Sequence, residues 1–251
     1  MSGHSKWSSI KHQKGAADAR RGQLFTKLTR EIMVAVREGG SSPDTNFRLR
    51  LAIQKARDNS MPLDNIERAI KRGSGELGGE NLVEMTLEGY GPGGAAILVQ
   101  ALSDNRNRTI QEVRNIFTRN GGSLGESGCV AWIFDLKGFI TIDTNGLDVE
   151  ELSLKAIDVG AEDVVPGDGC IEVYTKPDEL EVVRKALEAE DVAIASAEQT
   201  LMAKTTIKLD EKAALQTLRL LDKLENLDEV QQVCSNVDFA DDVVEKYQSQ
   251  T

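Results

Sequence analysis

The 251-residue chain has 40% hydrophobic residues, which is enough for a substantial core divided among one to three domains. Its two histidines, His4 and His12, lie at the start of the chain, so most of the sequence offers no Ser–His or Cys–His nucleophilic pair. Three widely spaced cysteines (Cys129, Cys170, Cys234) argue against a zinc site or a disulfide framework and favour a reducing compartment. This composition disfavours a hydrolase or a metalloenzyme.

No apolar run approaches the roughly 18 residues that span a bilayer, and no apolar stretch follows the charged N-terminus. We therefore expect no membrane segment, no secretory signal and a cytoplasmic location.

Charge divides the chain unevenly. Residues 1–73, here called the basic head, hold 15 Lys and Arg against seven Asp and Glu, a net charge of +8. The chain as a whole has 30 basic and 41 acidic residues, which leaves a net charge of −19 for residues 74–251. A basic segment on an acidic body indicates a head that binds a polyanion, and nucleic acid is the usual polyanion for a soluble protein.

Residues 1–20 are polar and basic, and we expect a flexible arm. Its cations can bind phosphates and Trp7 can stack on a base, although Trp7 can equally dock the arm onto the first helix.

Three short helices are predicted to follow. The first runs from about Arg20 to Glu38, and the second, capped by Asp44 or Thr45, runs to about Asp58. The third begins near Pro62 and ends at Gly73. Residues 73–80 are a glycine-rich linker by composition. Two formal GxGxxG matches, at residues 73–78 and 89–94, lack the strand-then-helix context of a dinucleotide site, and the second is interpreted as a hairpin loop.

The remainder alternates between strand and helix. Strands are predicted at 82–88 and 95–102, a helix to about 120 and a strand at 128–135. Residues 137–204 have the order βαββαβ, which is the ferredoxin-like unit. A helix at 211–224 and a strand at 230–237 then complete the earlier ββαβ block. The prediction is an α+β multidomain protein with a three-helix basic domain (1–78) and two related, ferredoxin-like α/β domains. The first of these is discontinuous (79–136 plus 205–251), and the second (137–204) is inserted into it.

The segment Asp104-Asn-Arg-Asn-Arg-Thr109 joins a strand to a helix. Its arginines and amides can bind a phosphate, or they can form a capping turn with solvated arginines. The acidic tail after Val237 is interpreted as hydrated surface carboxylates and not as a metal site.

Four motifs in order carry a family resemblance: residues 3–7 (GHSKW), residues 18–27, residues 89–94 (GYGPGG) and residues 104–109 (DNRNRT). Together they resemble the YebC/PmpR family, which includes the mitochondrial translational activator of cytochrome c oxidase. Phe47 stands where that family often has proline. Because the first motif begins at residue 3, we expect no transit peptide.

The resemblance implies a non-enzymatic regulator of gene expression without cofactors, metals or a small-molecule substrate. Members are described as DNA-binding transcriptional regulators or as ribosome-associated factors that relieve stalling at proline-rich stretches. The expected partner is therefore promoter DNA or the ribosome and its RNA, with ribosomal proteins as further contacts. The alternative is a protein-interaction module without direct nucleic-acid contact.

The resemblance does not assign contact residues, so the candidates come from charge and from the aromatic and imidazole groups of the arm. They are Lys6, Trp7, Lys11, His12, Lys14, Arg20, Arg21, Lys27, Arg30, Arg48, Arg50, Arg57, Arg72, Arg106 and Arg108.

Overall fold

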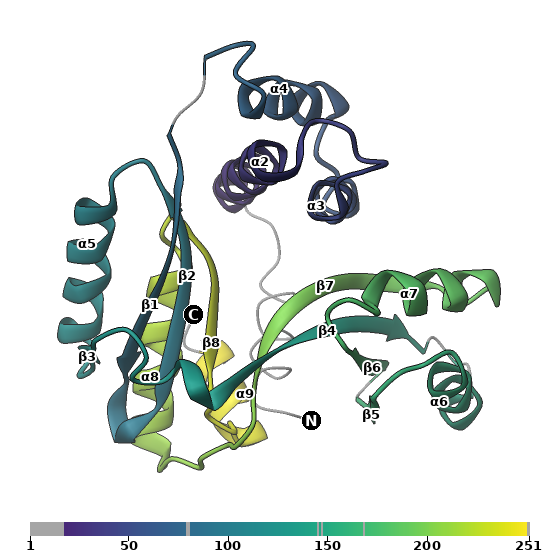
Figure 1. Ribbon diagram of the computed structural model, residues 1–251. Coiled ribbons are helices and arrows are strands. Elements are labelled where there is room, and N and C mark those ends of the chain that lie inside the picture. The colour runs from purple at the N-terminus through teal and green to yellow at the C-terminus, as the bar shows by residue number, and fades with distance from the viewer. Residues whose placement is uncertain (1–17, 79–80, 145, 147, 168, 250–251) are drawn as a thin grey trace. The chain divides into compact units, whose positions relative to one another are not determined.

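The computed structural model describes residues 18–78, 81–144, 146, 148–167 and 169–249, with side chains from residue 21 onward (Figure 1). It is α+β, as predicted. The chain divides into two compact units. Residues Asp135–Met202 form one, here called the inserted unit, and the described residues on either side of it form the other, the main unit. The division into three domains with the predicted boundaries stays a prediction.

Three helices begin the main unit: α2 (Asp18–Gly39), α3 (Phe47–Asp58) and α4 (Leu63–Gly73). Their apolar residues recur at helical spacing, and Leu28, Ile32, Leu49 and Ile66 are buried in a common core. Leu102, from the neighbouring sheet, belongs to the same core. The helical bundle therefore packs directly on the sheet that follows it.

Asn46 joins α2 to α3. Its Oδ1 accepts the backbone N–H of Leu49 at 3.0 Å, and its Nδ2 donates to the carbonyls of Ala35 and Gly40 at 2.7 and 2.8 Å. The predicted cap at Asp44 or Thr45 is wrong, because a carboxylate has no N–H and a hydroxyl has only one donor, whereas the amide of Asn46 satisfies groups of both helices at once.

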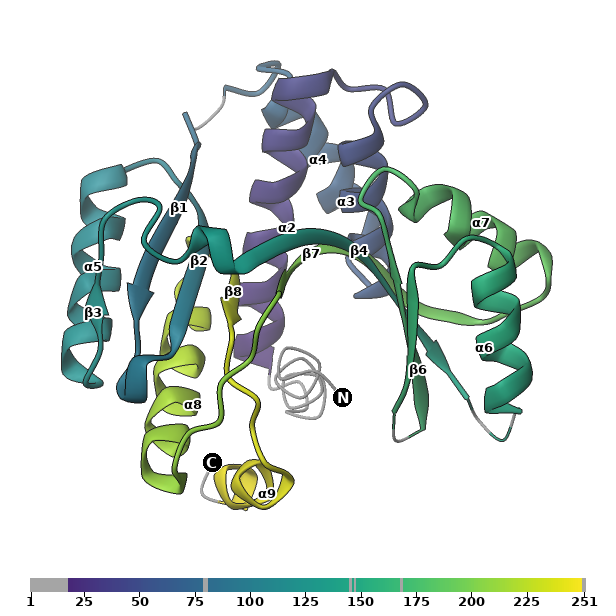
Figure 2. The same cartoon turned by 60° about the horizontal axis from the view of Figure 1, so that its bottom comes forward.

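A four-stranded antiparallel sheet in the order β3-β1-β2-β8 forms the rest of the main unit. Figures 1 and 2 show α5 and α8 on one face of it, where Phe117 and Leu221 are fully buried. The elements are β1 (Val83–Tyr90), β2 (Ala96–Ser103), α5 (Arg106–Arg119), β3 (Ser123–Leu124), α8 (Glu211–Glu225), β8 (Val230–Ser235) and α9 (Asp241–Ser249).

The glycine-rich segment between β1 and β2 is a hairpin loop, as predicted. It contains the short helix η1 (Pro92–Gly94), and Tyr90 pairs with Ala96 across the hairpin. Gly93 has φ 69°, and a Cβ there would lie 2.6 Å from Leu209, so this turn requires glycine.

The strand predicted at 128–135 is wrong over most of its length. A turn leads into the short helix η2 (Ala131–Ile133), and β4 begins only at Phe134. Here the buried carboxylate of Glu88 accepts the backbone N–H groups of Gly128, Val130 and Ala131 at 2.6, 2.8 and 2.7 Å. These N–H groups are turned toward one side chain and cannot pair with a neighbouring strand.

The inserted unit has the predicted βαββαβ order and the sheet order β5-β6-β4-β7 of a ferredoxin-like fold. Buried Ile140, Ile142 and Leu180 lie in its core. The elements are β4 (Phe134–Asp143), α6 (Val149–Asp158), β5 (Asp163–Pro166), β6 (Cys170–Thr175), α7 (Leu180–Ala189) and β7 (Ile194–Ala203).

The chain leaves and re-enters the main unit at adjacent points. The backbone N–H of Lys204 donates to the carbonyl of Ile133 at 2.8 Å. Across the described residues, no helix has the length and apolarity needed to cross a bilayer.

Replacing Asn46 by Ala removes one acceptor and two donors from a buried junction. We expect the free energy of unfolding to fall by about 1–3 kcal/mol, measured by urea denaturation. Asn59→Ala, at the exposed C-terminal end of α3, is the control and should cost less than about 0.5 kcal/mol. Equal losses of unfolding free energy in the two variants would show that Asn46 does not hold the junction between α2 and α3.

Glu88 predicts a pH dependence of stability. Burial raises the pKa of its carboxyl, but the hydrogen bonds from Gly128, Val130 and Ala131 outweigh burial and lower the pKa below its ordinary value. The carboxylate therefore stabilises the fold above its unfolded-state pKa of about 4.3, and this contribution is lost as the pH falls through the lower folded-state value.

We expect Glu88→Gln to lower stability at pH 7 by about 1–3 kcal/mol and the difference from wild type to narrow on acidification. Urea denaturation at several pH values between 7 and 3 measures this, with the exposed Glu112→Gln on α5 as control. A difference that stays constant with pH would contradict the assignment.

Candidate nucleic-acid interface

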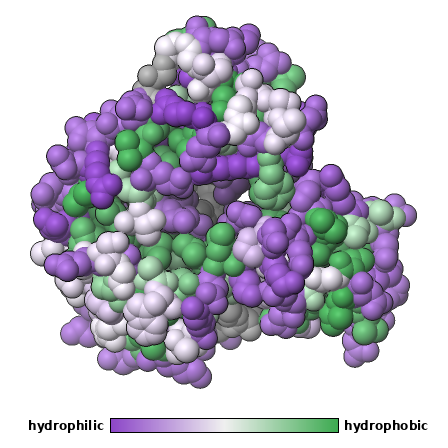
Figure 3. All heavy atoms as spheres, viewed as in Figure 1, coloured by the Kyte–Doolittle hydropathy of each residue, from purple (hydrophilic) through white to green (hydrophobic). Residues whose placement is uncertain are grey.

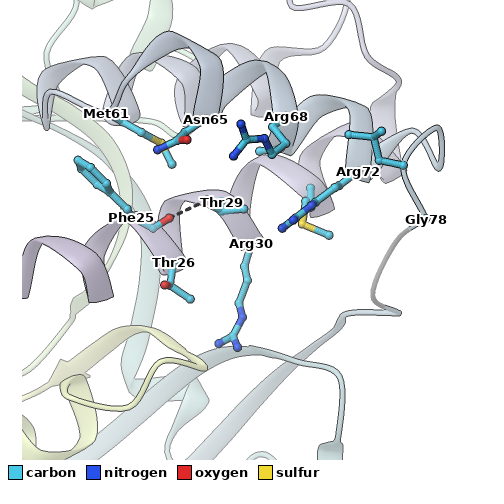
Figure 4. A pocket seen from close by; sticks show the side chains of 12 residues that line it. Phe25, Thr26, Thr29, Arg30, Met61, Asn65, Arg68, Arg72 and Gly78 are labelled. Atoms are coloured by element: carbon cyan, nitrogen blue, oxygen red, sulfur yellow. Dashed lines mark hydrogen bonds between the residues drawn. The ribbon is translucent and has the colours of Figure 1, made fainter. Parts of the chain in front are cut away.

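A cavity of about 510 Å³ opens between α2 and α4 in the helical bundle (Figure 4). From α2 it is lined by Phe25, Thr26, Thr29, Arg30 and Met33. From the segment ahead of α4, from α4 itself and from the residues that follow it, the lining is Met61, Asn65, Arg68, Ala69, Arg72, Leu77 and Gly78.

Helical spacing places the lining residues of α2 on one wall of the cavity and those of α4 on the opposite wall. Positions three and four apart share a face, so residues 25, 29 and 33 of α2 lie opposite residues 65, 69 and 72 of α4. The helices approach closely at Gly73, where a Cβ would lie 2.8 Å from the carbonyl oxygen of Met33.

Among the residues that the structure describes, three arginines and no acidic residue line the cavity. Arg68 and Arg72 are exposed, and neither has a partner within the part of the chain that the structure describes. Nη1 of Arg30 is buried without a hydrogen-bond acceptor among the same residues, while Nη2 lies 3.9 Å from the Glu229 carboxylate. The cavity therefore concentrates positive charge and unused donors.

Figure 4 shows Arg68 and Arg72 projecting from α4 over α2, and Arg30 extending from α2 in the direction away from α4. Phe25 and Asn65 face each other at the far end, beside Met61. The hydroxyl of Thr29 donates to the carbonyl of Phe25 at 2.7 Å, which leaves its oxygen lone pairs as acceptors. One end of the cavity is thus cationic, and the other combines an aromatic ring with an amide.

Only some of the predicted contact residues meet at this cavity. Arg30 and Arg72 line it. Arg21 and Arg57 are exposed elsewhere on the bundle. Lys6, Trp7, Lys11, His12, Lys14 and the side chain of Arg20 lie outside the described part of the chain.

Other predicted cations have partners inside the protein. Arg48 contacts Glu38 at 2.6 Å and Glu84 at 3.1 Å; burial lowers its pKa, but the two carboxylates outweigh burial and raise it. Arg50 donates to the carbonyl of Pro43 at 2.7 Å, and its guanidinium lies 5.8 Å from the centre of the Phe47 ring.

Lys27 donates to the carbonyl of Glu225. Together with Arg48, it connects the bundle to the elements that follow. Nucleic-acid contact by Lys27, Arg48 or Arg50 stays a prediction.

The junction before α5 is a capping turn. Asn105 Oδ1 accepts the N–H of Arg108 at 3.1 Å, and the Arg108 guanidinium contacts Asp104 at 2.7 Å and Glu229 at 3.1 Å. Asp104 is the main cause of the raised pKa of Arg108, with Glu229 adding to it. Arg106 is exposed and has no partner among the described residues. Phosphate binding by Arg106 and Arg108 stays a prediction.

Sequence analysis did not single out Arg68, Asn65 or Phe25 as contacts. The signal that would have found Asn65 and Arg68 is the face of one short helix that residues 65, 68 and 72 share. The net charge of residues 1–73 includes Arg68 but does not indicate where its side chain lies.

Known proteins are similar to this chain over its whole length. The profile described as "TACO1/YebC protein N-terminal domain" matches residues 5–76, and the profile described as "TACO1/YebC second and third domain" matches residues 82–237. A probable transcriptional regulatory protein of Dehalococcoides mccartyi strain CBDB1 is 63% identical over the full length of both chains.

Another protein with that name, from Herpetosiphon aurantiacus, is 53% identical, again over the full length of both. The crystal structure of a conserved hypothetical protein from Aquifex aeolicus is similar with a TM-score of 0.86 and 50% identity, covering 92% of this chain and 96% of the other. The chain belongs to the TACO1/YebC family.

Proposed function

We propose that this protein is a non-enzymatic regulator of gene expression that binds nucleic acid through its helical bundle. The observation that supports this most is the α2–α4 cavity, where Arg68 and Arg72 project from α4 and no acidic residue of the described part of the chain belongs to the lining. Guanidinium groups bind phosphate oxygens with charge-assisted hydrogen bonds, and their planar fork suits that geometry. The names of the relatives agree with a regulatory role.

Charge favours attachment by this end of the chain. Residues 74–251 carry a net charge of −19, so they repel phosphates that approach them. The arginines themselves differ in what surrounds them. Arg48 and Arg108 bind carboxylates of the protein, whereas Arg68 and Arg72 are exposed on one face of α4.

A second candidate function is protein docking by the inserted unit. Leu154, Ile157 and Val182, on α6 and α7, are 62%, 53% and 66% exposed, and Figure 3 shows hydrophobic side chains gathered on this unit. Apolar side chains exposed to this degree on neighbouring helices favour a protein contact. This role is compatible with nucleic-acid binding by the bundle.

The first test is the salt dependence of binding. We expect Arg68→Gln/Arg72→Gln to weaken binding to DNA or RNA by at least about tenfold at low salt. The slope of log affinity against log salt should become shallower by roughly 0.7–0.9 for each phosphate that the variant no longer binds. Fluorescence anisotropy between 50 and 200 mM salt measures both.

Lys71→Gln is the matched control, because Lys71 lies on the same helix but outside the cavity lining. Binding and slope that are the same in the double variant, the control and the wild type would refute the role of the cavity.

The choice between transcription and translation needs a test in cells. If the protein acts on the ribosome, deleting it should lengthen pauses at proline-rich codons in ribosome profiles. The Arg68→Gln/Arg72→Gln variant should fail to restore normal pausing, whereas Lys71→Gln should succeed. Unchanged pausing together with altered promoter occupancy would favour the transcriptional role.

A further inference from the structure

We infer that the α2–α4 cavity holds a single unpaired nucleotide, so that the bundle binds single-stranded nucleic acid in preference to duplex. This inference rests on the proposed function and narrows its partner class. It concerns Phe25, Met61 and Asn65, which line the cavity but would not contact the phosphates of a bound duplex.

The cavity is large enough for a nucleotide. A volume of about 510 Å³ lies within the range of small-molecule sites, roughly 300–1,000 Å³, and far exceeds the space needed by a phosphate oxygen. The bases of a duplex are stacked inside the helix, so a duplex could reach only the exposed Arg68 and Arg72 at the rim. Unstacked bases of a single strand can instead enter a pocket.

The lining of the cavity divides into a cationic part and an apolar part. Arg68 and Arg72 lie four residues apart on one face of α4, where two exposed guanidinium groups can bind one phosphate. At the other end, the half-buried ring of Phe25 and the side chain of Met61 provide apolar surface for a base. Phosphate and base would thus meet groups of matching chemistry.

Polar groups of the lining have hydrogen-bonding capacity that the described residues do not use. The Asn65 amide has no partner among the described residues and offers both a donor and an acceptor to a base edge. The buried Nη1 of Arg30 lacks an acceptor there, and the Glu229 carboxylate near Nη2 already supplies a negative charge. Asn65 is therefore the group of the lining that can read the edge of a base.

The test uses the full chain and four fluorescein-labelled probes: 12-nucleotide single-stranded RNA, single-stranded DNA of the same sequence, and the duplex form of each. We expect both single strands to bind at least about tenfold more tightly than the duplexes at 100 mM salt. Tighter binding of RNA than of DNA would indicate that the pocket also contacts the 2′-hydroxyl of the nucleotide.

Phe25→Leu keeps the apolar bulk and removes the aromatic face. It should weaken single-strand binding roughly five- to hundredfold, the range found when one stacked base loses its platform, and change duplex binding less than twofold. Asn65→Ala should weaken single-strand binding with the same selectivity. Thermal melting of each variant establishes that the fold is intact, and Asn65→Ala carries the test if Phe25→Leu does not fold.

A second readout does not depend on affinity. A 2-aminopurine placed in the single strand should lose fluorescence on binding the wild type, because the base stacks on Phe25. It should regain fluorescence with Phe25→Leu at saturating protein.

The outcomes separate the two proposals. Equal affinity for single strands and duplexes, with no effect of Phe25→Leu or Asn65→Ala, overturns the nucleotide pocket. If Arg68→Gln/Arg72→Gln still weakens binding in that case, the nucleic-acid role stands. If none of the four probes binds at low salt, both proposals fall.

Discussion

The attachment of α2 to the turn between α8 and β8 is the interaction on which the candidate site depends. Gln23 donates to the carbonyl of Asn226, Lys27 donates to that of Glu225, and Arg30 lies beside Glu229. Two of these acceptors are carbonyls at the C-terminal end of α8, where the helix dipole favours a cation. One side of α2 is thereby fixed to the sheet of the main unit, and its other side is left to form a wall of the cavity with α4.

The sequence separates a basic head from an acidic remainder, and the structure in turn separates the arginines of the head by their surroundings. The basic head supplies two sets of arginines. Arg48 neutralises Glu38 and Glu84, and Arg30 shares Glu229 with Arg108, so these residues hold the bundle against the sheet. Arg68 and Arg72 are exposed at the cavity. A count of charges cannot make this distinction, because Glu84 and Glu229 are remote in sequence from the arginines that they contact.

Periodicity was sufficient to predict most elements and the α+β class, because each helix and strand buries a face whose spacing is visible in the chain. It failed where a side chain replaces the usual backbone partner. Glu88 takes the N–H groups of residues 128–131, so a β-like run becomes a turn, and Asn46 caps α3 in place of Asp44 or Thr45. It also missed α9, whose polar sequence starts with Asp241 and Asp242, residues that favour a helix N-terminus. The cavity could not be predicted, since it depends on the distance between α2 and α4.

The hydrogen bond from Lys204 to Ile133 has a consequence for the history of this architecture. The chain leaves the main unit after Ile133 and returns at Lys204, and these two points are adjacent. The inserted unit therefore occupies the position of a short loop ahead of α8. Such a module can be exchanged, enlarged or lost over evolution while the surrounding sheet keeps its strand order. The inserted unit can thus change in size and sequence while the main unit, bundle included, keeps its architecture.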